Sequence, residues 1–268
     1  MSRTPFALLA VVGLVAVAGC GAVLPGGDLG PGGDETDLEP ADSPYTTPLE
    51  NSDLLADHEA ALRAAGTFTV VRNTTVTDSG ADGGFESLTT ARVSLADGRV
   101  YETQRPPPVA QYYRYGDGTT FTRYRTGDSY QYSRSANDSD VRSAAEWGRE
   151  PVAQFLPLAS LEHRGATERA DGLVHVYRTT DPADVDVDAL TGEASAEATL
   201  SAVNVTIRVH ESGAVTALRL SYTVENGDRE RTVETSVTYT AVGETDGSPP
   251  AWVDEARDRF GDGDDDAG

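Results

Sequence analysis

The sequence predicts an α+β domain built on a large, mostly antiparallel sheet that curves like half a barrel, with a few helices on its apolar face. Near the C-terminus, apolar and polar residues alternate in three successive segments, 203–209, 218–225 and 233–241. The turn sequences Ser212-Gly213 and Asn226-Gly227 separate them, as in antiparallel hairpins. More β-rich segments lie upstream, and a sheet of about eight or nine strands tends to curl.

The folded domain is expected to span 51–260 and to open with a helix. Asn51 or Ser52 can cap this helix, and Gly66 stands where it should end. Apolar residues recur at helical spacing on one side of it, with His58 expected at the surface or rim. The residues of that side are Leu54, Leu55, His58, Ala61, Leu62 and Ala65.

Strands follow this helix. A β-branched segment at 67–77 precedes the hairpin signal Asp97-Gly98, and a meander with Gly-containing turns covers 109–134. A helical interval over 140–161, interrupted by Pro151 and Pro157, is expected to form a lid over the sheet. The remaining elements are strands at 91–95, 99–103 and 173–179, a loop or short helix at 181–192, and a last helix at 251–260 that docks through Trp252 and Phe260.

The N-terminus has the features of an export signal, which we assign to residues 1–19. Its apolar run is shorter than the roughly 20 residues of a membrane-spanning helix. The single cysteine, Cys20, ends the sequence Val-Ala-Gly-Cys, which resembles the lipobox of bacterial and archaeal lipoproteins. This resemblance implies cleavage before Cys20, a lipid on its thiol, and a protein anchored to the extracellular face of the cell membrane. An uncleaved anchor with a chance cysteine is the alternative.

Two segments flanking the domain are expected to be disordered. The stretch 20–50 contains the lipidated Cys20 and then an acidic linker rich in Gly and Pro, with little apolar surface to bury. The tail, 261–268, is acidic as well. A lone cysteine also excludes a disulfide framework.

The charge is strongly negative along the whole chain. Asp and Glu number 44, the 21 basic residues are all Arg, and the formal net charge is −23. Such a charge excludes long-range attraction to nucleic acid. In concentrated salt the Debye length falls to about 3 Å, so like charges hardly repel each other. The composition resembles that of haloarchaeal proteins, which is the source we expect.

Motifs for catalysis or metal binding are incomplete. His58-Glu59 begins a zinc-protease pattern, but Leu62 stands where the second histidine is needed. The calcium-loop spacing at 184–188 continues without the required Gly and Glu. No nucleophile elbow or phosphate-binding loop is present, so we expect no enzyme, no cofactor and no metal.

Tyrosines are concentrated in the meander and form a possible ligand face: Tyr112, Tyr113, Tyr115, Tyr124, Tyr130 and Tyr132. Arginines are interleaved with them, so the alternative is an ordinary meander whose rings stack on Arg across strands. Three sequons, at Asn73, Asn137 and Asn204, are possible N-glycosylation sites.

The order of helix, meander, inserted helices and further strands resembles the half-barrel of the LolA-like lipoprotein carriers and the mycobacterial lipid-binding lipoproteins. The layout is also similar to haloarchaeal lipoproteins of unknown function. The resemblance implies a non-enzymatic cell-surface protein that binds a lipid-like, apolar or amphipathic ligand in a cavity between sheet and helices. A structural or interaction module with a filled core is the alternative, and a hydrolase using unrecognised carboxylates is the third hypothesis. No protein partner is indicated.

Overall fold

The computed structural model describes residues 38–49, 51–79, 84–105, 109–136, 138, 141–191, 199–227 and 229–261. The predicted signal peptide, Cys20, Asn137 and the acidic tail after residue 261 lie outside these residues.

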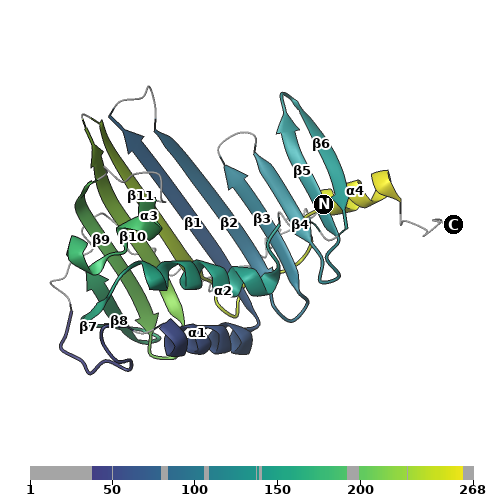
Figure 1. The fold of residues 1–268 in the computed structure, drawn as a ribbon. Coiled ribbons are helices and arrows are strands. Elements are labelled where there is room, and N and C mark those ends of the chain that lie inside the picture. The colour runs from purple at the N-terminus through teal and green to yellow at the C-terminus, as the bar shows by residue number, and fades with distance from the viewer. Residues whose placement is uncertain are drawn as a thin grey trace, which may run out of the picture. The chain divides into compact units, whose positions relative to one another are not determined.

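Within the described residues, eleven strands form one open antiparallel sheet (Figure 1). Its order is β6-β5-β4-β3-β2-β1-β11-β10-β9-β8-β7, so two meanders meet where β1 pairs with β11. The predicted fold class is confirmed. The strands are β1 Thr67–Asp78, β2 Phe85–Ser94, β3 Arg99–Arg105, β4 Ala110–Arg114, β5 Thr120–Thr126, β6 Ser129–Ser135, β7 Glu162–Arg169, β8 Gly172–Thr179, β9 Thr199–His210, β10 Val215–Asn226 and β11 Arg229–Thr240.

The sheet has more strands than the eight or nine expected. One of them, β7, lies where no strand was predicted, because its sequence is polar and shows little alternation. Its pairing with β8 and a bridge between Ala166 and Glu39 make it a strand. Tertiary pairing therefore decides the structure of this segment.

Two helices cover one face of the sheet, which we call the inner face (Figure 1). They are α1 Asn51–Ala65 and α2 Ala144–Phe155, and α2 contacts α1, β2 and β10. On β1 the inner face carries Phe68, Val70 and Arg72, because side chains alternate across a strand. Ser143 caps α2 by accepting a hydrogen bond from the Glu146 backbone, while the Glu146 carboxylate accepts one from the Ser143 backbone.

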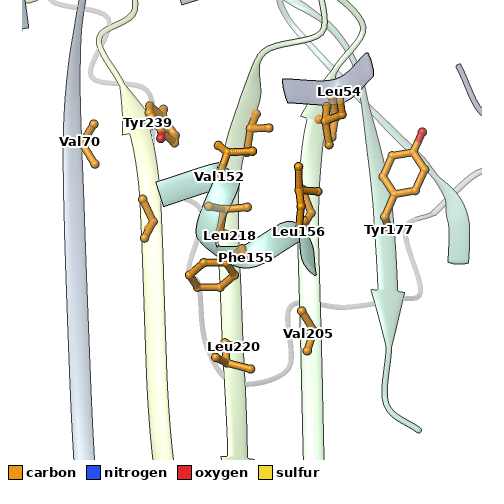
Figure 2. Close-up of a cluster of buried hydrophobic side chains, with 14 of the residues drawn as sticks. Leu54, Val70, Val152, Phe155, Leu156, Tyr177, Val205, Leu218, Leu220 and Tyr239 are labelled. Atoms are coloured by element: carbon orange, nitrogen blue, oxygen red, sulfur yellow. The ribbon is translucent and has the colours of Figure 1, made fainter. Parts of the chain in front are cut away.

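The core lies between these helices and the sheet (Figure 2). Leu54 and Leu62 of α1, and Val152 and Phe155 of α2, are buried against the apolar side chains of β1, β9, β10 and β11. Trp147 of α2 is only 1% exposed. These side chains fill the space under the predicted lid, where a ligand cavity was expected.

The lid helix continues through Pro151 instead of stopping there. Proline removes one backbone hydrogen bond from a helix interior. Pro151 is buried, as are Trp147 and Phe155 one turn on either side, so apolar burial offsets that loss. The chain then tightens into a 3-10 helix, η2 Leu156–Leu158, at Pro157.

The last helix, α4 Trp252–Phe260, does not join the other helices on the inner face. It packs on the opposite, outer face, where Trp252 and Val253 are buried beside Tyr113 and Phe121. Trp252 docks as predicted, whereas Phe260 remains 40% exposed.

Part of the predicted linker is ordered against the sheet. Glu39 bridges to Ala166 of β7, and the Leu49 N–H donates to the Leu161 carbonyl at 2.8 Å. Leu49 is buried, and the Ser43 hydroxyl lies 2.9 Å from that of Tyr177. The prediction of disorder up to residue 50 was therefore wrong for 38–49, because Leu49 and its neighbours bury apolar surface. None of the helices in the described ranges has the length and apolarity needed to span a membrane.

Leu62→Ala should destabilise the fold by about 2–5 kcal/mol, because Leu62 is 1% exposed and joins α1 to the core. Urea unfolding measures the difference. Leu173→Ala is the matched control, since Leu173 is 37% exposed and its truncation should change the unfolding free energy by less than about 0.5 kcal/mol. Equal effects of the two substitutions would contradict the packing of α1.

Candidate functional site

The inner face continues beyond α2 toward the far ends of the long strands (Figure 1). There it carries apolar side chains on β9, β10 and β11, which we call the apolar lane: Val203, Leu220, Tyr222, Val224 and Val233. Strand register places Tyr222 opposite both Val203 and Val233. From Leu218, under α2, to Val224 is six residues, or about 20 Å. The lane is therefore as long as a long-chain alkyl group.

The lane is partly covered. Val203, Leu220 and Val233 are buried, whereas Tyr222 and Val224 are half-buried. A short helix, α3 Val187–Thr191, lies beside it, and the Tyr222 hydroxyl donates to the Leu190 carbonyl at 3.3 Å. α3 confirms the loop or short helix predicted for 181–192.

Polar side chains occupy the inner face on the neighbouring strands β1, β2 and β3. Arg72, Thr89 and Gln104 lie in register across them, and all three are half-buried. Glu102, one row nearer α2, is 3% exposed and accepts a hydrogen bond from Gln104 Nε2 at 2.6 Å. Burial raises the pKa of Glu102 above its usual range. In the row of Arg72 the inner face changes from apolar to polar at β1, whereas the row of Val76 stays apolar as far as Phe85 of β2.

The six tyrosines of the predicted ligand face do not share a face. Tyr112 and Tyr124 pair in register with Glu102 and Ala110, and so lie on the inner face. The other four, Tyr113, Tyr115, Tyr130 and Tyr132, belong to the outer side.

The outer tyrosines hold α4. Arg259 lies 4.2 Å from the centre of the Tyr132 ring, whose hydroxyl donates to Glu255 at 2.7 Å. Arg257 lies over Tyr115 and donates to its hydroxyl. This arrangement is the stacking of tyrosine on arginine that we considered as the alternative.

An open hollow of about 590 Å³ is lined by η2 and by the residues that precede α3. Leu49, Leu156 and Val185 form buried parts of its wall, while Asp184 and Asp186 are exposed on its rim. The Asp184 residue belongs to the 3-10 helix η3 Pro182–Asp184 and accepts a hydrogen bond from Thr179. Two carboxylates at the rim make this hollow unsuitable for an anionic ligand.

The histidines occupy sites that sequence spacing did not indicate. His163 Nε2 and His175 Nδ1 lie 3.3 Å apart across β7 and β8, and burial lowers the pKa of both rings. A register shift between His163 and Gly165 brings the rings together, and a bulge of this kind leaves no clear signal in sequence. Among the described residues, no group of three or more His, Cys, Asp or Glu side chains could hold a metal.

Two predicted glycosylation sites lie on the outer face. Asn73 pairs with Ser236 and Asn204 with Ser221, and both are half-buried in long strands. Arg178 Nε donates to Asn204 Oδ1 at 3.1 Å. Glycosylation at Asn73, Asn137 and Asn204, and the lipid on Cys20, remain predictions.

Comparison with known proteins gives a family without an assigned function. Residues 5–256 match a family of unknown function, DUF7537. The chain belongs to this family. No curated protein sequence matches the chain. The expected haloarchaeal source and lipobox remain predictions.

Solved structures similar to this DUF7537 chain include two mycobacterial proteins and a LolA superfamily protein. LprF from Mycobacterium bovis is 14% identical, with 74% of this chain and 94% of that chain covered and a TM-score of 0.40. The lipoprotein LppX from Mycobacterium tuberculosis is 19% identical, with 74% and 100% covered and a TM-score of 0.28. For the LolA superfamily protein from Nitrosomonas europaea the identity is 10%, the coverages are 72% and 94%, and the TM-score is 0.25.

His58 lies in the core of this family member and not at the helix surface, so the predicted position was wrong. Its ring is fully buried, accepts a hydrogen bond from the Val215 backbone at 3.1 Å, and packs 4.8 Å from the Tyr239 ring. Burial lowers the pKa of His58 to about 4. Helical spacing correctly placed His58 on the apolar side of α1. It did not predict that the ring is buried in the core.

His58→Gln should reduce the loss of stability at acidic pH. Between pH 4 and 6.5 the unfolded wild type binds more protons than the folded protein, so the unfolding free energy falls as the pH falls. The wild type should lose about 3 kcal/mol more than the variant between pH 7 and pH 4, measured by urea unfolding. Identical pH profiles would show that His58 is protonated equally in both states.

Proposed function

We propose that this protein is a non-enzymatic, lipid-anchored cell-surface protein whose inner face binds an apolar or amphipathic, lipid-like ligand. The amphipathic inner face beyond α2 carries this proposal. The apolar lane offers hydrocarbon contact, and burial of apolar surface contributes about 25 cal/mol per Å². The polar row of Arg72, Thr89 and Gln104 lies beside it and can bind a head group.

The groups along the lane support a binder over an enzyme. Valine, leucine and tyrosine side chains supply dispersion and apolar contact, and none of them is a general base or nucleophile at neutral pH. Burial raises the pKa of Tyr222 further.

The N-terminal sequence supports the proposed anchor. A lipid on Cys20 would tether the domain through residues 21–37, which contain six glycines and two prolines. Because one acyl chain gives only marginal membrane binding, we expect a lipid with two chains.

The alternative of a structural or interaction module is favoured by the packed core. Under α1 and α2, Leu54, Trp147 and Val152 are at most 1% exposed, so this part of the inner face is occupied by the protein itself. The two functions differ in the role of the apolar lane. A ligand binder needs the lane as its binding surface, whereas a structural module does not.

Val224→Asp should weaken binding of a fatty acid such as myristate about 10-fold or more, because it places a charge on the lane. Thr223→Asp is the matched control: Thr223 is the preceding residue of β10, is equally half-buried, and lies on the outer face. Calorimetric titration measures both affinities. Absence of myristate and of any co-purified lipid from the wild type, tested by native mass spectrometry, would support the structural module.

Cys20→Ser should release the protein from the membrane or leave it unprocessed, since the serine hydroxyl cannot replace the lipidated thiol. Fractionation of cells and medium, with the intact mass of the product, measures the outcome. A mature, membrane-bound Cys20→Ser protein would refute the lipid anchor, and the wild type prepared in parallel is the control.

A further inference from the structure

Arg72 is a positive charge on the inner face, at the boundary between its apolar and polar parts. It projects from β1 on the same side as Val70 and Val76, both buried. Its partner in β11 is Val237, which in turn pairs with Leu218 of β10. Strands lie about 4.8 Å apart, so Arg72 lies roughly 10 Å from the β10 strand that carries the lane.

Among the described residues, Arg72 has no compensating partner. Its guanidinium makes no hydrogen bond or ion pair in the described part of the chain, although the side chain is half-buried. Burial and the nearby Arg142 lower the pKa of Arg72. A buried charge without a partner is costly, and an anion that binds in contact with it removes much of that cost.

Two charged groups of the region around Arg72 are already engaged. Arg142, which precedes α2, forms an ion pair with Glu150 at 2.8 Å. Glu102 accepts the hydrogen bond from Gln104, and burial raises its pKa. Beside Arg72, Thr74 and Thr89 add hydroxyl groups that can donate to an anion. The local chemistry therefore suits an oxyanion.

We infer that Arg72 binds the anionic head group of an amphipathic ligand, a carboxylate or phosphate ester, whose hydrocarbon lies along the apolar lane. This inference rests on the proposed function and specifies its ligand class. The guanidinium can donate two parallel hydrogen bonds to such a group.

The negative charge of the protein affects anion binding at Arg72, and the size of this effect depends on the salt concentration. A net charge of −23 repels anions at low ionic strength, whereas concentrated salt shortens the range of that repulsion. Contacts of a half-buried guanidinium are screened less than exposed ones. Recognition of an anion at Arg72 is thus compatible with the composition.

The test compares two ligands with one acyl chain, myristate and the neutral monomyristin, by calorimetric titration of the wild type, Arg72→Gln, Arg72→Lys and Arg208→Gln. Arg72→Gln should bind myristate about 10-fold more weakly or worse, with monomyristin affinity unchanged within 2-fold. Arg72→Lys keeps the positive charge but not the two parallel hydrogen bonds, so its myristate affinity should lie between those of the wild type and Arg72→Gln. Arg208 is the matched control, because it is half-buried with a pKa lowered by burial, but lies on the outer face of β9. Circular dichroism and urea midpoints verify that each variant is folded.

The outcomes separate the inference from the function on which it rests. If the wild type binds both ligands and Arg72→Gln changes neither affinity, the assignment of Arg72 is overturned and the proposed function stands. If the wild type binds neither, the proposed function fails. Acetate and inorganic phosphate, each titrated alone, test whether the site binds a free anion. If either binds the wild type as tightly as myristate does, and Arg72→Gln abolishes this binding, the assignment of an amphipathic ligand is overturned.

Discussion

The backbone pairing of β1 with β11 holds the two halves of the sheet together. Ten residue pairs, from Thr69 with Thr240 to Asp78 with Arg231, join the first strand to the last. All other neighbouring strands are consecutive in the chain, so each half is a local meander. With β1 and β11 at the centre, β6 and β7 become opposite edges, and the chain between them has to cross the sheet. The crossing segment is α2, which explains why its apolar side chains form the core of the inner face.

The use of arginine in place of lysine is reflected in the packing of side chains on the outer face. Arginine stacks on aromatic rings in six places in the described structure, among them Arg92 on Tyr101 and Arg123 on Tyr130. A planar guanidinium can lie on a ring and still donate hydrogen bonds, which an ammonium group does less well. The tyrosines and arginines of the meander, together with α4, are therefore largely explained by packing. The proposed ligand site therefore lies on the other side of the sheet.

On the inner face, the row of residues that contains Arg72 changes from apolar to polar across β1, whereas the row of Val76 stays apolar. The change follows from the sequences of the two meanders, because Val203, Leu220 and Val233 come from the C-terminal one, whereas Thr89 and Gln104 come from the N-terminal one. The pairing of the two meanders creates the boundary at which Arg72 lies, and the sequence showed no sign of that position because Arg72 stands in a β-branched strand with no ligand-binding motif around it.

The sequence by itself determined the fold class, the three C-terminal strands, the apolar side of α1 and the docking of Trp252. These features depend on local periodicity and turn chemistry, which short segments express without the rest of the chain. Only the tertiary structure decided that β7 is a strand, that His58 is buried, that residues 38–49 pack on β7 and β8, and that the tyrosines divide between two faces. Each of these depends on strand register or on contacts between residues far apart in sequence, as between Glu39 and Ala166 or His58 and Val215. No local pattern encodes such contacts, so the sequence predicted the sheet, whereas the pairing of β1 with β11 decided which side chains share its inner face.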